Sequence, residues 1–266
     1  MTRNRGRVHG PIVDPEKTSA RFDNRAELYA RYRPGYPAEM YEYLLHESAL
    51  PQDGAIADLG SGTGILAAPL LDRGFCVYGV EPNDDMRAVA ESALGRNPNF
   101  HSLNATAEAT HLDDASVDLV VAGQAFHWFE PEATRAEVRR ILRPGGRCAL
   151  IWNQRQLDTT PFLRAYEAFL LEWGTDYQAV SETYANPDAI ALVLGANCLV
   201  RRFENVQAFD EEGLLGRLRS SSYTPAADDA NFQPMIAALR TLFANHEQRG
   251  IVRIEYTTEV YLSAAP

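Results

Sequence analysis

The chain has 266 residues, of which 45% are hydrophobic and 23% charged, an ordinary composition for a folded globular protein and not that of a disordered chain or a coiled coil. Its formal net charge of −11 argues against a dedicated binder of nucleic acid or of an anionic membrane, which needs a dense basic surface. A small molecule is therefore the expected partner, and no window approaches the roughly 18 uninterrupted apolar residues that would span a bilayer.

The first ten residues carry three arginines with no apolar stretch behind them, so we expect a mobile tail there and not a secretory signal. Cys76, Cys148 and Cys198 are widely spaced among apolar neighbours. This indicates buried thiols in a reducing cytoplasm, without a disulfide or a metal site. The histidines show no metal-ligand spacing with cysteine or carboxylate partners, so no metal is expected.

Strand-like and helix-like patterns alternate through the first half of the chain. Short apolar runs predict strands at 54–60, 76–81, 100–105, 117–123 and 147–152. Helical spacing of apolar residues predicts intervening helices at 37–49, 65–74, 84–94 and 132–142. Repeated units of this length imply right-handed crossovers, with helices on both faces of the sheet.

The pattern changes beyond Trp152, where two helices, 161–174 and 186–195, follow one another without a strand. We expect a helical lid there, over residues 155–200. The chain then returns to the sheet through predicted strands at 203–210 and 250–264 and predicted helices at 211–220 and 231–247. The predicted fold class is α/β, a doubly wound, mostly parallel, seven-stranded Rossmann-like sheet with a helical lid inserted after the fifth strand.

The segment ADLGSGTG, residues 57–64, places three glycines directly after the first predicted strand. In an open parallel sheet, ligands bind beyond the carboxyl ends of the strands, where a glycine-rich turn lets the backbone approach the ligand. The spacing here is G-x-G-x-G, whereas a dinucleotide-binding turn has its third glycine one position later, where this chain has Ile65. The second strand ends at Glu81, whose carboxylate can accept hydrogen bonds from both ribose hydroxyls of an adenosine. The alternative is a tight turn followed by a surface glutamate.

Four segments in order resemble the motifs of class I S-adenosylmethionine-dependent methyltransferases: ADLGSGTG, VYGVEPNDDM, NATAEATHLDDASVDLVVAGQAFHWF and ILRPGGRCALIW. More narrowly, YARYRPGYP and QAFHWF resemble the small-molecule group that includes the trans-aconitate and cantharidin methyltransferases. The resemblance covers residues 22–152, and it extends to the C-terminal part only in general layout. It implies S-adenosylmethionine as the cofactor.

The resemblance also implies roles for the residues that match its motifs. Asp58 would fix the turn and reach the amino end of the methionine, and Glu81 would hold the ribose. The turn itself would pack against methionine and ribose through Gly60, Ser61, Gly62 and Gly64.

The adenine side of the implied cofactor site departs from the family pattern. Pro82 and Met86 would flank the ring, methionine being an adaptable apolar neighbour for a flat group. Family members often have an aspartate where this chain has Thr106. The contact to the adenine amino group therefore falls to the Thr106 hydroxyl, to backbone near Ala107, or to Glu108.

Gln124 and His127 follow the fourth strand at its carboxyl end, so we expect both near the sulfonium methyl group, with Gln124 also touching the cofactor. Methyl transfer is an in-line displacement in which the protein chiefly positions the nucleophile and excludes water. His127 either accepts a proton from the acceptor or only orients it.

The aromatic segment YARYRPGYP has two interpretations, an entry to the helix at 37 or a flap that closes over the cofactor. In the second, a tyrosine hydroxyl or an arginine binds a carboxylate by charge-assisted contacts. The candidate acceptor-binding residues are Tyr29, Tyr32, Arg33, Tyr36, Trp128, Arg155 and Tyr223.

The sequence therefore predicts an enzyme that moves a methyl group from S-adenosylmethionine to an oxygen or nitrogen of a small molecule, with a carboxylate or a natural product as acceptor. A nicotinamide-dependent oxidoreductase and a catalytically inactive cofactor-binding protein are the alternatives. We expect a cytoplasmic monomer or homodimer. Its predicted parts are a tail and flap (1–36), a cofactor-binding core (37–154), the helical lid (155–200) and a C-terminal completion of the sheet (201–266).

Overall fold

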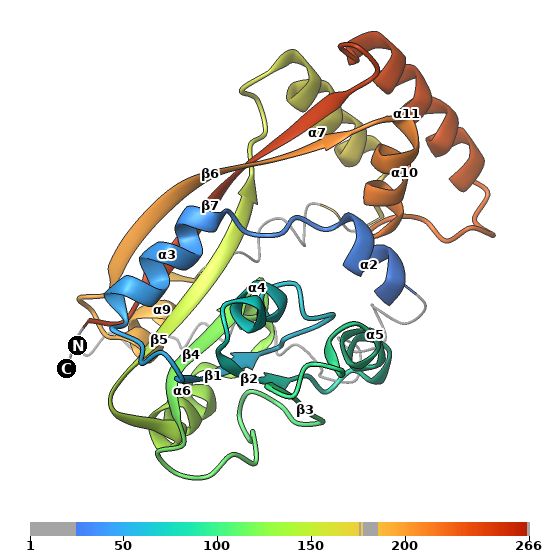
Figure 1. Ribbon diagram of the computed structural model, residues 1–266. Helices are drawn as coiled ribbons and strands as arrows, with labels where there is room; N and C mark the ends of the chain where they lie inside the picture. The colour runs from blue at the N-terminus through green and yellow to red at the C-terminus, as the bar shows by residue number, and fades with distance from the viewer. Residues whose placement is uncertain (1–24, 176, 178–185, 265–266) are drawn as a thin grey trace, which may run out of the picture.

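A single mixed sheet of seven strands runs through the computed structural model, which describes residues 25–175, 177 and 186–264 (Figure 1). The strands lie in the order β3-β2-β1-β4-β5-β7-β6, and β7 is antiparallel to both of its neighbours. Their bounds are β1 Ala55–Leu59, β2 Cys76–Val80, β3 Phe100–Leu103, β4 Val117–Gly123, β5 Leu142–Arg155, β6 Leu199–Phe209 and β7 Val252–Leu262. The predicted doubly wound, mostly parallel, seven-stranded sheet is confirmed. The predicted tail, residues 1–24, lies outside the described residues.

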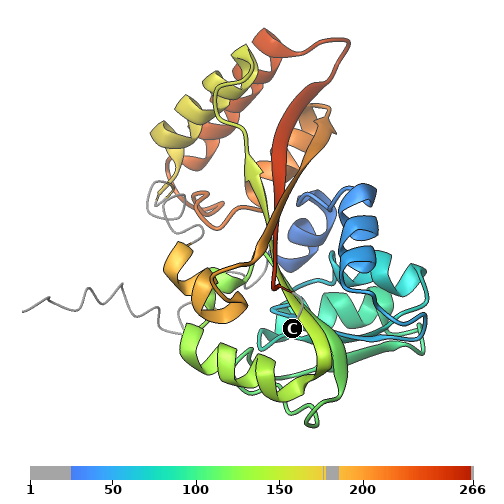
Figure 2. The ribbon, with the colours of Figure 1, turned by 90° about the vertical axis from the view of Figure 1, so that its left-hand side faces the viewer.

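Helices cover both faces of the sheet, as Figure 2 shows from the side. On one face α3 (Ala38–Glu47), α4 (Ala67–Asp72) and α5 (Asp84–Leu94) share a buried apolar core with the strands. On the other, α6 (Pro131–Ile141) and α9 (Pro187–Leu194) pack together over β5 and the strands beside it. Apolar runs such as Val117–Gly123 are buried between these two layers, which is why they contain almost no polar residue.

The helices begin where the sequence offers a side-chain cap or a proline. The Asn83 side chain accepts a hydrogen bond from the Met86 amide at the start of α5, 2.8 Å away. Asp210 does the same for the Gly213 amide in α10 (Glu211–Arg219), also at 2.8 Å. These caps satisfy amides that have no partner within the helix. Three further helices start on a proline, whose missing N–H costs nothing there: Pro131, Pro161 and Pro187.

The strands β5, β6 and β7 extend beyond the others and carry a second layer of helices (Figures 1 and 2). This helical layer consists of α7 (Pro161–Trp173), α10 and α11 (Phe232–His246), which pack around their own apolar cluster with the far half of β7. The segment 155–200, expected as one lid, is thus divided: α7 joins the helical layer, whereas α9 lies beside α6 on the sheet. Residues 176 and 178–185 of that segment lie outside the described residues.

A helix that the sequence did not predict, α2 (Ala26–Tyr32), lies between the helical layer and the core in Figure 1. It contacts α10 on one side and α5 on the other. The Tyr32 ring packs directly on Gly216, where an added Cβ would meet ring carbons at 2.3 to 2.6 Å. Because only glycine leaves room for the ring, this position determines how closely α2 approaches α10.

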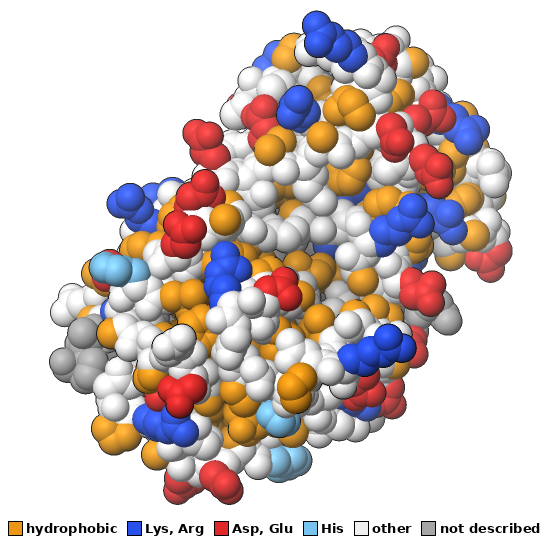
Figure 3. Space-filling view, viewed as in Figure 1, with side chains coloured by type: hydrophobic (Ala, Val, Ile, Leu, Met, Phe, Trp, Pro, Cys, Tyr) orange, Lys and Arg blue, Asp and Glu red, His pale blue; other side chains and the backbone are white. Residues whose placement is uncertain are grey.

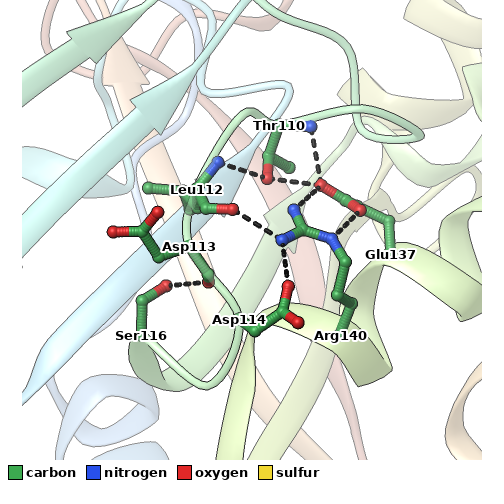
Figure 4. A network of polar contacts seen from close by, with 7 residues as sticks. All are labelled: Thr110, Leu112, Asp113, Asp114, Ser116, Glu137 and Arg140. Atoms are coloured by element: carbon green, nitrogen blue, oxygen red, sulfur yellow. Dashed lines mark hydrogen bonds and ion pairs between the residues drawn. The ribbon is translucent and has the colours of Figure 1, made fainter.

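A polar network ties the loop between β3 and β4 to α6 (Figure 4). The Glu137 carboxylate accepts hydrogen bonds from the Thr110 amide (2.8 Å) and hydroxyl (2.6 Å), and from the Arg140 guanidinium (2.7 Å). Arg140 in turn donates to the Leu112 carbonyl and to Asp114, both at 2.7 Å. These bonds hold the pKa of Glu137 down at about 2, with the Arg140 bonds as the largest cause.

Candidate active site

The glycine turn between β1 and α4 has three glycines in the left-handed region, with φ of +65° at Gly60, +55° at Gly62 and +84° at Gly64. A Cβ on Gly60 would lie 2.6 Å from the Ala125 Cβ, and one on Gly64 would lie 2.5 Å from Leu94 Cδ1. At Gly62, by contrast, nothing lies within 4 Å of a Cβ position. Gly60 and Gly64 thus permit close packing, while Gly62 leaves its backbone open toward free space.

Glu81 lies against this turn from the end of β2. Its Oε2 accepts a hydrogen bond from the Gly62 amide (2.9 Å) and its Oε1 accepts one from the Asn83 amide (2.8 Å). Burial raises the pKa of Glu81, although the two amide bonds and the Arg87 charge act in the opposite direction. The acid is only 9% exposed, so its position is fixed by backbone amides and not by solvent.

Asp58, the last polar residue of β1, is buried with its Oδ2 lacking a hydrogen-bond partner among the described residues. Burial, and secondarily the Glu81 charge, raise its pKa to about 8. A buried carboxyl group without a partner destabilises the fold, so such groups in native proteins call for an explanation. A cationic group of a ligand would supply the missing partner.

A cavity of about 340 Å³ opens at the carboxyl ends of β1 and β4 and reaches up to the helical layer. This is the point where the strand order reverses, since β1 pairs with β2 on one side and β4 on the other. At the sheet end it is lined by Asp58, Gly60, Ser61, Gly62, Thr63, Ile65, Leu66, Gly123, Gln124, His127 and Trp128. At the end near the helical layer it is lined by Arg155, Leu157, Glu167, Tyr177, Arg217, Ser222, Tyr223 and Tyr256.

Gln124 and His127 both face this cavity from the segment after β4. Gln124 is held in the left-handed region at φ +56°, and its Nε2 donates to the Asn153 carbonyl at 3.2 Å. Its buried Oε1 has no hydrogen-bond partner within the described part of the chain. Burial lowers the pKa of His127 to about 4, so the imidazole is neutral at neutral pH.

The N-terminal segment that follows α2 covers one side of the cavity. Tyr29, Arg33 and Tyr36 line it, whereas Tyr32 points to Gly216 instead. The Gly35 carbonyl accepts hydrogen bonds from two amide side chains of the sheet, those of Asn153 (3.0 Å) and Asn205 (2.8 Å). The segment is therefore anchored to β5 and β6.

Arg155 lines the cavity as the sequence suggested, but its charge is already balanced. Its guanidinium forms an ion pair with Glu167 and donates to the Tyr177 hydroxyl at 2.7 Å. The same Tyr177 hydroxyl donates to Glu167 at 2.6 Å. This closed network leaves Arg155 a weaker candidate for binding an anionic ligand than its position in the sequence indicated.

The residues predicted for the adenine side do not border the cavity. Met86 and Ala107 are buried, and Glu108 accepts a hydrogen bond from the Glu130 amide at 2.9 Å. Glu81, Pro82 and Thr106 also lie outside the cavity wall. The structure thus brings the methionine-side and acceptor-side candidates together in one space, and leaves the adenine-side assignments as predictions.

Several cavity residues were missed by the sequence interpretation, chiefly Arg217 and Tyr256. Arg217 is buried in α10, and only the packing of that helix over the sheet end reveals it. Tyr256 belongs to β7, where its side chain alternates with those of a long strand. Neither position carries a local sequence signal.

The described residues contain no cluster of three or more His, Cys, Asp or Glu side chains that could hold a metal ion. Within the same ranges, none of the helices combines the length and the apolar character that crossing a membrane requires. All three cysteines are free, but only Cys148 is fully buried, because Cys76 and Cys198 lie nearer the surface than the sequence suggested.

Comparison with known proteins finds similarity to methyltransferases, in sequence over about half of the chain and in fold over most of it. Residues 57–150 match the family model of a methyltransferase domain. An uncharacterized methyltransferase of Mycobacterium tuberculosis is 43% identical over 137 residues, 52% of this chain and 54% of that protein. The malonyl-[acyl-carrier protein] O-methyltransferase of Hahella chejuensis is 34% identical over 153 residues, 53% of this chain and 52% of the relative. The chain thus spans about half the length of the curated relatives it matches.

The similarity of the fold extends over more of the chain than the sequence matches do. A solved structure from Anaeromyxobacter dehalogenans, assigned as a type II methyltransferase, superposes with a TM-score of 0.64 at 24% identity, covering 87% of this chain and 97% of the other. The match between 57 and 150 includes the glycine turn, β2, β4 and most of β5. Residues 57–150 therefore match a methyltransferase domain, the sheet has the fold of a solved methyltransferase structure, and S-adenosylmethionine is the cofactor that these matches indicate.

Proposed function

We propose that this chain transfers a methyl group from S-adenosylmethionine to an oxygen or nitrogen atom of a small molecule held in the cavity. The observation that carries the proposal is the meeting of two features in one space. The open backbone at Gly62 and the unpartnered Oδ2 of Asp58 lie on one side, and Gln124 and His127 lie on the other. When bound, the cofactor supplies a methyl group on a positively charged sulfur.

The residues present fit this cofactor. Asp58 would pair with its amino group, which satisfies the orphaned Oδ2. Gly62 gives room for the ligand to lie against the main chain. Each Glu81 oxygen accepts a single amide bond, so each keeps a lone pair for a ribose hydroxyl.

The chain's own groups then position the acceptor and exclude water. His127 is neutral, so it can accept or donate a hydrogen bond without adding charge near the reaction. Gln124 is fixed by its bond to the Asn153 carbonyl, and its buried Oε1 is left to accept a hydrogen bond. Tyr36 lies over Gly123, where a Cβ would come within 2.5 Å of its hydroxyl, and closes the space beside the end of β4.

A carboxylate oxygen is the acceptor that best suits this environment. A carboxylate is already ionised at neutral pH, so its methylation needs no general base. A histidine whose pKa is near 4 is a weak base and would deprotonate a hydroxyl poorly. The Hahella relative is likewise an O-methyltransferase.

The distribution of surface charge favours a small-molecule acceptor over a polyanion such as nucleic acid. On the face shown in Figure 3, acidic and basic side chains are interspersed, and no broad basic patch gathers there. A nicotinamide cofactor is disfavoured, because the third glycine of the turn is Gly64, one position earlier than in a dinucleotide-binding turn, and no feature of the described part of the site favours it.

Calorimetry with S-adenosylhomocysteine and with NAD tests the proposal. We expect the first to bind and the second not to, and the reverse result would refute the cofactor assignment. Glu81→Gln should weaken S-adenosylhomocysteine roughly 10- to 100-fold, the scale of a hydrogen bond to a charged group. Glu39→Gln, an exposed acid on α3, is the matched control and should bind like the wild type. Turnover of a carboxylate-bearing acceptor separates an enzyme from an inactive cofactor-binding protein.

A further inference from the structure

The charged side chains around the cavity do not balance one another. Its described lining contains two acids, Asp58 and Glu167, and three arginines, Arg33, Arg155 and Arg217. Glu167 is paired with Arg155, and Asp58 forms no ion pair with an arginine among the described residues. Two positive charges are therefore uncompensated, in a protein whose formal net charge is −11.

Arg217 is the more deeply buried of these two, at 5% exposure. Its guanidinium donates to the Ser221 hydroxyl at 2.9 Å and, over a longer 3.4 Å, to the Tyr256 hydroxyl. Among the described residues no carboxylate lies within ion-pair distance of it. An arginine keeps its charge in proteins, so a buried one without an anion destabilises the fold until an anion arrives.

Arg33 approaches the same end of the cavity from the segment after α2. It lies over the Tyr29 ring, 5.1 Å from the ring centre, and donates to the Ser220 carbonyl at 3.2 Å. Its buried Nε has no hydrogen-bond partner within the described ranges. Like Arg217, it forms no ion pair with a described carboxylate.

The Tyr223 hydroxyl lies in the electric field of both arginines. Burial alone raises a tyrosine pKa, as it does for Tyr166 in the same helical layer. At Tyr223 burial acts the same way, but the charges of Arg217 and Arg33, together with a Ser221 hydrogen bond and the Arg155 charge, act against it, and the pKa is lowered. A negative charge at this position is therefore stabilised.

We propose that an anion-binding site lies at the helical-layer end of the cavity and is formed by Arg217, Arg33 and Tyr223. This site binds one carboxylate group of the methyl acceptor, and the methyl group is transferred to a different group of the same molecule. That the bound anion belongs to the methyl acceptor rests on the proposed function. Reaction occurs near Gly62 and His127 at the sheet end, so the site anchors the acceptor by a second group. It selects acceptors that carry at least one fixed negative charge.

A carboxylate suits the site better than a phosphate. Arg217 lies in the last turn of α10, where the helix dipole is negative, and not at an N-terminus that would offer a row of amide donors. The donors are guanidinium and hydroxyl groups, which match the charge and the planar shape of a carboxylate. A phosphate dianion would lack the additional amide donors that usually surround it.

Succinate, dimethyl succinate and inorganic phosphate are the probes for the first test. Each is titrated into the full chain at constant ionic strength, with and without S-adenosylhomocysteine, and binding is followed by calorimetry and thermal shift. We expect succinate to bind, the neutral ester not to, and phosphate to bind more weakly. Equal binding of the ester, or tighter binding of phosphate, would overturn the proposal.

Two arginines on one helix give a matched pair of variants. Arg217→Met should weaken succinate roughly 10- to 100-fold. Arg219→Met removes the same charge from an exposed position of α10 and should leave succinate binding unchanged. Both variants should bind S-adenosylhomocysteine like the wild type, which also shows that they fold. Succinate affinity equal in Arg217→Met and wild type would refute the site.

The tyrosinate absorbance provides a readout that a purely structural role of Arg217 would not change. Comparing the pH titration of this absorbance in Tyr223→Phe and in the wild type identifies the part that comes from Tyr223. Saturating succinate should raise the Tyr223 pKa, because the bound carboxylate offsets the field of Arg217 and Arg33. An unchanged Tyr223 titration would contradict the proposal. If S-adenosylhomocysteine fails to bind while succinate does, the proposed function falls and the anion site stands.

Discussion

The Gly62 amide donates a hydrogen bond to the Glu81 carboxylate, 2.9 Å away, and so joins the ends of β1 and β2. The opposite side of Gly62 faces open space, since nothing lies within 4 Å of a Cβ position. One residue is thus held from behind by an acid and exposed in front to the cavity. This relationship explains why the chain keeps a glycine where packing alone would accept a larger side chain.

Gly62→Ala tests this directly. Alanine is strained at φ +55°, so we expect the free energy of unfolding to fall by about 1 kcal/mol. The added methyl group also occupies space that the cofactor needs, and S-adenosylhomocysteine should bind roughly 5- to 100-fold more weakly. Gly74→Ala is the control, because Gly74 has φ +90° and equally open surroundings but lies away from the cavity. It should lose similar stability and no affinity, and a parallel loss of affinity would contradict the assignment.

Asp58→Asn should separate stability from binding. The folded pKa of about 8 lies above the ordinary value of 3.8, so between these limits the folded state binds more protons than the unfolded state. The free energy of unfolding of the wild type therefore falls as pH rises from about 4 to 8, on the order of a few kcal/mol. The asparagine variant should lack this fall and be the more stable protein at pH 8.

Cofactor affinity should fall in Asp58→Asn, although the stability of this variant at pH 8 should rise. A cationic ligand group beside Asp58 favours its ionised form, so cofactor binding at pH 7 should release a proton, and Asp58→Asn should lose both the proton release and affinity. Calorimetry in buffers of different ionisation enthalpy measures the proton. Asp53→Asn, an exposed acid before β1, is the control. Proton release that persists in Asp58→Asn would show that another group titrates.

The sequence was sufficient for most of the sheet because its signals are local. The apolar run at 117–123 coincides with β4, and the helix expected at 84–94 coincides with α5, which has both a cap and an acidic first turn. The strand expected at 147–152 is longer in the structure, Leu142–Arg155. Its added C-terminal residues are polar, and they pair with the far half of β7, a contact that no local pattern reveals.

In the candidate site, too, the residues with local sequence signals could be predicted and those brought in by tertiary packing could not. Gly62 and Glu81 could be placed because a turn and the next strand end are neighbours in any parallel sheet. Arg217 could not, because its surroundings arise only when α10 packs over the cavity more than 150 residues after the turn. The helix α2 was missed for a similar reason: it is a seven-residue helix whose stability comes from contacts with α10 and α5.

Glu137→Gln should weaken the link between α6 and the loop after β3. Hydrogen bonds from Arg140 and Thr110 lower the pKa of Glu137 to about 2, below the ordinary 4.5, so its carboxylate contributes stability above pH 4.5 that is lost as pH falls toward 2. We expect the variant to lose about 1.5 to 3 kcal/mol at pH 7 and much less at pH 3. Urea unfolding at both pH values, with Glu39→Gln as the control, measures this. A loss that is equal at both would show that the charge is not responsible.

A double-mutant cycle between Gly216 and Tyr32 tests how α2 is seated. Gly216→Ala places a methyl group within 2.6 Å of the Tyr32 ring, so we expect a loss of about 1 to 3 kcal/mol. In the Tyr32→Ala background the clash is gone, and the same change should be neutral or stabilising by about 1 kcal/mol, because alanine favours a helix interior more than glycine does. Urea unfolding of the four proteins gives the coupling.

The Gly216 and Tyr32 variants should also affect the cavity, because Tyr29 in α2 and Arg33 directly after it line the cavity wall. If α2 is displaced in Gly216→Ala, succinate should bind more weakly than in the wild type, while the hydrogen bond between Gly62 and Glu81 is untouched and S-adenosylhomocysteine affinity is retained. Equal unfolding costs in both backgrounds would mean that Tyr32 does not determine the fit at Gly216. In that case the close approach of α2 to α10 depends on the hydrogen bonds from Arg25 and Arg33 to the turn after α10.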